Sequence, residues 1–127
     1  MSITTLTLLS NVVTGTPNGN YDGSSIDFES DPVRAVGYYQ GQGSLETVFI
    51  TVDNFPGKII LQATLDSDPA QANWVDVFEY GDGSTAATDF RYPVNLTGNF
   101  AWLKAVVTDF EEYNSNPAYI TSVAVSY

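Results

Sequence analysis

Turn-forming residues recur along this chain at intervals that leave room only for short strands between them. Clusters rich in Gly, Pro, Asn and Asp lie at residues 16–20, 22–23, 31–32, 41–43, 55–57, 66–69, 81–83 and 97–99. The segments between these clusters are rich in Thr, Val, Ile, Tyr and Phe, which favour β-strands. They leave no room for the crossover helices that join parallel strands, and no window has a trustworthy helical period. The chain is therefore predicted to be all-β and antiparallel.

Short strands at regular spacing, joined by polar turns, are typical of β-sandwiches and barrels. We predict about nine strands, centred on residues 3–13, 25–29, 34–39, 45–52, 58–65, 74–80, 92–96, 100–108 and 119–127. The chain has 127 residues, the size of one ordinary domain, and it contains no linker or internal repeat. The prediction is a single antiparallel β-sandwich over residues 1–127 with a jelly-roll-like strand order.

Apolar residues at every second position of a strand are predicted to face the core. Two strands have this pattern, with Val48, Ile50 and Val52 in one and Ile59, Leu61, Ala63 and Leu65 in the other. Segment 100–108 is apolar at most positions of both faces, which predicts a central strand. The last strand changes phase, and a β-bulge at residues 121–122 would turn Ile120, Val123 and Val125 inward. Pro56 and Gly57 fit the central positions of a type II turn.

The residue types that are absent limit the chemistry of this chain more than those that are present. It has no cysteine and no histidine, which removes thiolate nucleophiles, the commonest general base and the commonest transition-metal ligand. The chain has fifteen acidic and four basic residues, and the resulting net charge of −11 would repel nucleic acid and anionic membranes. Residues 1–5 lack the features of a secretory signal, so we expect synthesis and folding in the cytoplasm.

Aromatic residues provide the candidate contact surface. Adjacent strand residues point to opposite faces, so one of Tyr38 and Tyr39 is expected to be exposed, as an interface residue, a glycan contact or a cover for a sheet rim. Loop 110–117 and the strands at the two ends of the chain are the other candidate contact regions. The candidate interface residues are Tyr38, Tyr39, Phe110, Tyr113 and Tyr119.

Several polar and aromatic residues have two alternative interpretations. Trp74 and Trp102 lie in strands, where a core role is favoured over a sugar-stacking platform. Asp66 and Asp68 share a turn and could ligate Ca²⁺, although bonding to the turn backbone is the favoured interpretation. The acids at positions 27, 29 and 31 would share one face of a solvated edge strand. Paired carboxylates of a hydrolase would need a cleft, and no motif indicates one.

Three segments carry a longer pattern of residues. The first is VGYY at residues 36–39. The second is FPGKIILQATLD at residues 55–66, followed by Pro69 and by WVDV at residues 74–77. The third is NLTGNFAWLKAV at residues 95–106, and the strand 120–127 completes it. In this order and spacing, over roughly the last 90 residues, the chain resembles small virion structural proteins of large tailed phages, notably phages of cyanobacteria.

The resemblance implies a β-sandwich that acts as a non-enzymatic structural or accessory protein of the virion. It would be a decoration protein of the capsid or a component of the neck, baseplate or tail, and it would be assembled into the virion in the host cytoplasm. The partners implied are other virion proteins and further copies of the chain, with no cofactor, nucleic acid or membrane. The alternative is a carbohydrate-binding host-recognition module of a tail fibre. A hydrolase is a distant third hypothesis.

Overall fold

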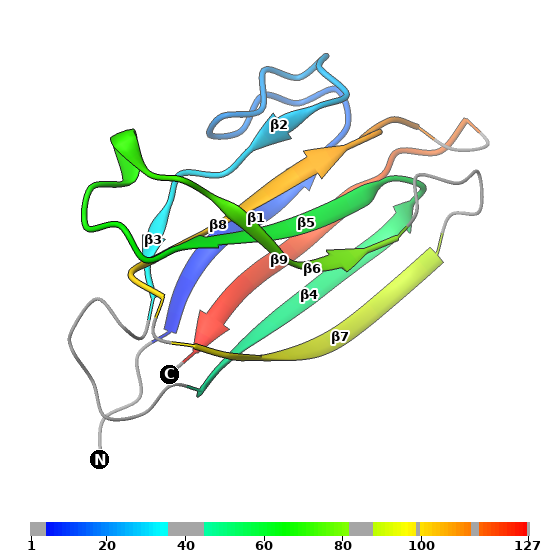
Figure 1. The fold of residues 1–127 in the computed structure, drawn as a ribbon. Helices are drawn as coiled ribbons and strands as arrows, with labels where there is room; N and C mark the ends of the chain where they lie inside the picture. The colour runs from blue at the N-terminus through cyan, green and yellow to red at the C-terminus, as the bar shows by residue number, and fades with distance from the viewer. Residues whose placement is uncertain (1–4, 36–44, 82–87, 99, 113–114, 127) are drawn as a thin grey trace.

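Two antiparallel sheets pack face to face in the computed structural model, which describes residues 5–35, 45–81, 88–98, 100–112 and 115–126 (Figure 1). The first sheet has the strand order β1–β9–β4–β7, and the second has the order β2–β8–β5–β6, with β3 also paired to β8. The strands are β1 Thr5–Val13, β2 Phe28–Glu29, β3 Val33–Arg34, β4 Leu45–Phe55, β5 Lys58–Thr64, β6 Val75–Tyr80, β7 Thr88–Thr97, β8 Trp102–Thr108 and β9 Tyr119–Ser126.

The strand order is that of a jelly roll, in which two Greek keys fill two four-stranded sheets. The short strands β2 and β3 both pair with β8, so together they occupy one strand position at the edge of the second sheet. The terminal strands β1 and β9 pair with each other along their whole length. The predicted fold class, an antiparallel sandwich with jelly-roll-like order, is confirmed.

The core lies between the two sheets and follows the predicted alternation. In β4 and β5 the predicted inward residues are buried, with the exception of Leu65, which is 73% exposed because it lies beyond the end of β5. The predicted bulge in β9 is also present. Thr51 of β4 pairs with Ser122, whereas Val52 pairs with Ile120, so Thr121 is the extra residue. As expected, Ile120, Val123 and Val125 are all fully buried.

The predicted strand ranges agree with the observed ones except at the ends of a few elements. The strand expected at 25–29 is reduced to Phe28–Glu29, and part of the one expected at 34–39 lies outside the described residues. Strand β7 begins at Thr88, earlier than expected. In the described part of the chain the one helix is a 3₁₀ turn at Pro69–Gln71. No helix there has the length and apolarity needed to cross a membrane.

The turn between β4 and β5 differs from the predicted type II turn. That turn type needs a positive φ at its third residue, and Gly57 has none, whereas Asn54 has a φ of 51°. Gly57 is instead required by close packing. A Cβ atom placed there would lie 2.1 Å from the carbonyl oxygen of Thr108 and 2.6 Å from that of Asp109. The turn is thus pressed against the end of β8, which leaves no room for any side chain.

An aromatic cluster closes one end of the core. The ring of Phe110 lies 5.0 Å from Tyr21, 5.5 Å from Phe28 and 6.1 Å from Phe55, measured between ring centroids. Its backbone N–H donates to the carbonyl of Ile26 at 2.8 Å, which ties the end of β8 to the long loop before β2. Phe110 is 1% exposed, so it belongs to the core. Its predicted role as an interface residue is therefore wrong.

Candidate functional site

A row of polar side chains crosses the outer face of the second sheet. Gln62 on β5 pairs with Asp76 on β6 on one side and with Lys104 on β8 on the other. Directly paired residues of antiparallel strands place their side chains on the same face. The sequence neighbours of Gln62 and Lys104 are buried in the core. The three polar side chains therefore point outward, side by side. We call Asp76, Gln62, Lys104 and Glu29 the polar row.

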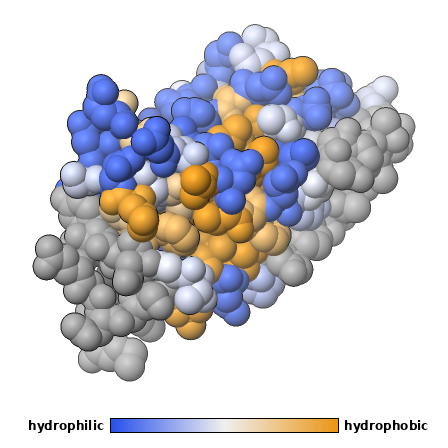
Figure 2. All heavy atoms as spheres, viewed as in Figure 1, coloured by the Kyte–Doolittle hydropathy of each residue, from blue (hydrophilic) through white to orange (hydrophobic). Residues whose placement is uncertain are grey.

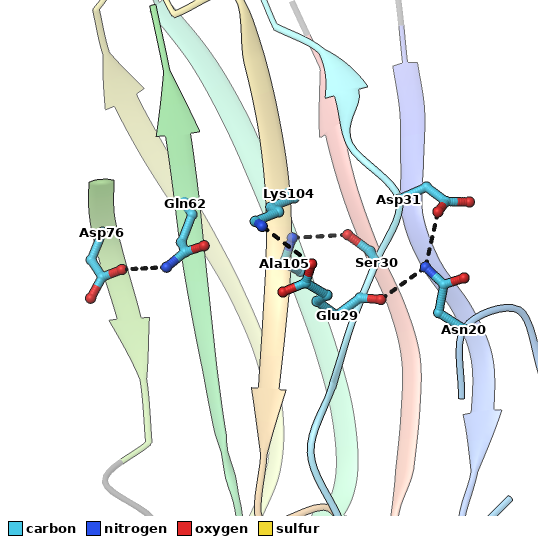
Figure 3. A network of polar contacts seen from close by, with 8 residues as sticks. All are labelled: Asn20, Glu29, Ser30, Asp31, Gln62, Asp76, Lys104 and Ala105. Carbon is cyan, nitrogen blue, oxygen red and sulfur yellow. Dashed lines mark hydrogen bonds and ion pairs between the residues drawn. The ribbon is translucent and has the colours of Figure 1, made fainter. Parts of the chain in front are cut away.

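Hydrogen bonds and an ion pair hold the polar row in place (Figure 3). The Gln62 Nε2 atom donates to Asp76 Oδ1 at 2.8 Å. The Lys104 ammonium lies 3.3 Å from Glu29 Oε1 on β2. A carboxylate offers about four acceptor positions and an ammonium three donors, so these contacts leave capacity for a ligand. The row therefore presents fixed donors and acceptors to the solvent.

The outer end of the row is anchored by the loop that precedes β2. Asn20 Nδ2 donates to the carbonyl of Glu29 at 3.0 Å and to Asp31 Oδ1 at 2.9 Å. The buried residue Ser30 accepts from the backbone N–H of Ala105 at 2.9 Å and donates its own N–H to the Ala105 carbonyl at 2.8 Å. The short strand β2 is thereby fixed to β8 although it has only two residues in the ladder.

Both tryptophans lie on the outer side of this sheet, and the prediction that they belong to the core is wrong. Trp102 begins β8 and is followed by the inward-facing Leu103, so its own side chain points outward and is half-buried. Its Nε1 donates to the carbonyl of Ser67 at 3.0 Å. Trp74 precedes β6, and the Lys104 ammonium lies 4.6 Å from the centre of its ring. This cation–π contact joins the indole to the polar row.

A hollow of about 270 Å³ opens beside the Trp74 ring, and we call it the Trp74 hollow. Its lining consists of Glu29, Pro32, Pro69, Ala70, Trp74 and Lys104. Its volume lies just below the range for small-molecule sites, roughly 300–1,000 Å³. The hollow thus has room for a small group, with an aromatic ring and two prolines on its walls and a charged donor and acceptor at its edge.

Apolar side chains lie next to the polar row on the same face. Ile60 of β5 pairs with Val106 of β8, and both are half-buried and point outward. Figure 2, which views the molecule from this side, shows hydrophobic residues gathered over the middle of the face with hydrophilic residues around them. An apolar strip bordered by donors and acceptors matches a ligand that has both an apolar face and hydroxyl groups.

Each lysine on this face lies beside an acid, and Asp76 of the polar row adds a further carboxylate. Lys104 is paired with Glu29, and Lys58 of β5 lies 2.9 Å from Glu79 of β6. Such exposed pairs stabilise the fold little, about 0–1 kcal/mol each. Their effect is to keep the face free of a large field of either sign. A neutral ligand fits this face better than a strongly charged one.

The other predicted interface residues have separate outcomes. Tyr38, Tyr39 and Tyr113 lie outside the described residues. Tyr119 begins β9 and is 40% exposed on the outer face of the first sheet, opposite the polar row. The polar row and Tyr119 are therefore on different surfaces of the molecule.

The acidic residues singled out from the sequence bond to the protein itself. Asp66 Oδ2 accepts from the backbone N–H of Asn73 at 2.8 Å, and Asp68 Oδ1 accepts from that of Ala70 at 3.0 Å. These bonds agree with the favoured interpretation that both carboxylates hold the turn. Within the described ranges no three acidic residues gather as a metal site would require. The acids at positions 27, 29 and 31 are exposed at the edge of the second sheet, as expected, although only Glu29 lies in a strand, and Glu29 and Asp31 also bond to Lys104 and Asn20.

Sequence reasoning missed the polar row. The available signal was Lys104, a charged residue in the middle of a strand predicted to be central. A lysine at such a position needs a partner or an open face. The identity of the partners depended on the lateral order of four strands, which the pattern of residues within each strand does not contain.

Comparison with known proteins adds a fold likeness and no more. No family model matches the chain, and no curated protein matches it. Among solved structures, the family 29 carbohydrate-binding module CBM29_1 from Piromyces equi is similar, with a TM-score of 0.49 and 10% sequence identity. The match covers 99% of this chain and 91% of that one. A likeness at this level carries no argument about function, which rests on the geometry of the site.

Proposed function

We propose that this protein is a non-catalytic carbohydrate-binding module that holds a neutral glycan on the outer face of its second sheet. The observation that carries the proposal is the Trp74 ring at the wall of a hollow, with Lys104 and Glu29 fixed at its edge. A sugar ring has an apolar face of C–H groups and a rim of hydroxyls. The aromatic ring would pack on the apolar face, and the polar row would bond to the hydroxyls.

The neutrality of the ligand follows from charge. Both lysines of the face are paired with acids and Asp76 adds a further carboxylate, while the chain as a whole carries a net charge of −11. An anionic glycan would be repelled during its approach, and it would find Lys104 already paired. A neutral sugar is not repelled by the chain, and it needs no unpaired lysine. The donors and acceptors lie on paired strands rather than on loops, so they need little ordering when a ligand binds.

Titration calorimetry with a series of neutral oligosaccharides, chosen by a glycan-array screen, tests the proposal. Trp74→Ala should weaken binding by about 30-fold, because a tryptophan at the centre of a contact typically contributes about 2 kcal/mol or more. Tyr119→Ala is the matched control, since it removes an exposed aromatic ring from the opposite sheet, and it should leave the affinity unchanged. Failure of the wild-type chain to bind any neutral glycan would refute the proposal.

A second candidate function is docking to protein partners, which is the virion role that the resemblance implies. The observation that favours it is the outer face of the first sheet, where three rows of paired residues contain no acid. The two functions use opposite faces and are compatible, as they would be in a host-recognition module carried on a particle. The virion role stays a prediction, and mass spectrometry of purified phage particles would test it.

A further inference from the structure

The outer face of the first sheet is built mostly from small, uncharged residues arranged in rows. Strand pairing places one row across all four strands, namely Thr5, Ser126, Thr47 and Asn95. The next row contains Thr7, Ala124, Phe49 and Pro93, and a third contains Ser10, Ser122, Thr51 and Arg91. Because directly paired residues share a face, these rows form one continuous surface. We call it the threonine face, and it lies on the far side of the sandwich in Figure 1.

The threonine face is nearly free of charge on a chain that is strongly acidic. The paired residues of its three rows include no acid, and they include one base, Arg91 of the edge strand β7, which pairs with Thr51. Glu46 of β4 is buried on the inward face, and the first acid on the outer face of this strand is Asp53, which pairs with Tyr119 at the end of the face. It lies four residues from Phe49, about 13 Å along the strand. The opposite sheet, by contrast, has acids and lysines across its outer face. The lack of acids over three rows is thus specific to one of the two sheets.

An exposed aromatic ring lies in the middle row of the face. Phe49 is 50% exposed, and its neighbours in the row are small, so its ring projects from a flat surface. Leu45, on the same strand, is 58% exposed. Polar groups around Phe49 already bond to one another, since Thr47 donates to Asn95 Oδ1 at 2.8 Å. Covering this face would bury apolar area and leave few polar groups without partners.

We propose that the threonine face binds the same face of a second copy of the chain. In a two-fold contact each residue near the axis meets its own counterpart, so any acid there would repel itself. A face whose rows contain no acid is what such a contact requires from a chain with a net charge of −11. A basic partner protein would instead be attracted to the acidic surfaces elsewhere. Two flat sheet faces also pack readily on each other, as the two layers of a sandwich do.

The charge pattern further fixes how salt affects the contact. Two copies that each carry a charge of −11 repel one another at long range, while the three rows that form the contact contain no acid for a base to pair with. Added salt screens the repulsion and leaves the contact intact. The dimer should therefore become tighter as the salt concentration rises, whereas an association based on ion pairs between opposite charges would become weaker.

Sedimentation equilibrium of the full chain at several salt concentrations tests this inference independently of glycan binding. The wild-type chain should form a dimer that tightens with salt, and Phe49→Asp should raise the dimer dissociation constant at least about tenfold because it places two acids near the axis. Leu65→Asp is the matched control. It adds the same charge at a residue that is 73% exposed on a loop, and it should leave dimerisation close to that of the wild type.

Phe49→Thr is a second variant that should not disturb the fold, because it replaces the ring by threonine, a residue type that is already common on this face. It should also weaken the dimer while circular dichroism shows an intact fold. A wild-type chain that stays monomeric up to about 1 mM would overturn the inference. Dimers of both Phe49 variants as tight as the wild type would overturn it as well, and so would a wild-type dimer that salt weakens.

Discussion

The carboxylate of Asp22 organises the loop that leads to β2. One of its oxygens accepts from the backbone N–H groups of Ser24 at 2.8 Å and Ser25 at 2.7 Å, and the other accepts from the Ser25 hydroxyl at 2.8 Å. The bonds from the backbone of Ser24 and then Ser25 lower the pKa of Asp22 from 3.8 to about 2. The charged form of this exposed residue is therefore the form that fits the folded loop.

Replacement of Asp22 by asparagine should destabilise the protein at neutral pH and not at very low pH. A carboxylate whose pKa is lower in the folded state stabilises the fold above the unfolded pKa, and this contribution disappears as the pH falls from about 4 to about 2. Urea unfolding of both chains at pH 7, 4 and 2 should show the difference shrinking over this interval. An NMR titration in which Asp22 changes protonation near its ordinary pKa would contradict the argument.

At the scale of the element, the turn between β4 and β5 depends on Gly57. Gly57→Ala should lower the free energy of unfolding by roughly 3 kcal/mol, the upper end for overpacking, because the new methyl group meets the rigid backbone of Thr108. Gly19→Ala is a useful comparison. Its Cβ would have open space but a φ of +59°, so it should cost only about 1–2 kcal/mol of backbone strain. Equal losses in chemical denaturation would show that close packing at Gly57 is not the cause.

The strands could be predicted because the alternation of apolar and polar residues that marks a strand lies within the strand itself. Alternation in β4 and β5 identified the inward residues, and a phase change in β9 located the bulge at Thr121 without knowledge of the partner strand. Strand β8 was harder, because apolar residues occupy both of its faces. The pattern there did not tell whether Trp102 or Leu103 faced the core. In the structure the small residue Ala105 shares the inward face with Leu103, and the large indole of Trp102 remains outside.

At the scale of the whole molecule, the candidate site depends on the order in which distant strands pair. Glu29, Gln62, Asp76 and Lys104 come from four strands that only the jelly-roll topology makes neighbours. A shift of one residue in the pairing of β5 and β8 would send Gln62 or Lys104 to the other face. Neither the order nor the register is encoded in the pattern of one strand. The sequence therefore contains each residue of the polar row, but it does not show that these residues are neighbours.

The same topology makes the first strand essential to the whole fold. Strand β1 pairs with β9, which lies at the other end of the sequence, and it buries Leu8, Leu9 and Val12 in the core. Burial of each such side chain contributes about 1.5–3 kcal/mol, and a domain has a total stability of only about 5–15 kcal/mol. A chain that lacks residues 1–13 should therefore fail to fold, with loss of the cooperative unfolding transition in circular dichroism and calorimetry.

Because β1 lies at the edge of its sheet, its place is open to a strand supplied from outside. A synthetic peptide of residues 1–13 added to the truncated chain should restore a cooperative transition, since it returns the hydrogen bonds to β9 and the three apolar side chains. The same peptide with Val12 replaced by aspartate is the control, and it should fail because it brings a charge into the core. Cooperative unfolding of the truncated chain on its own would show that β1 is an accessory to the sandwich rather than part of its core.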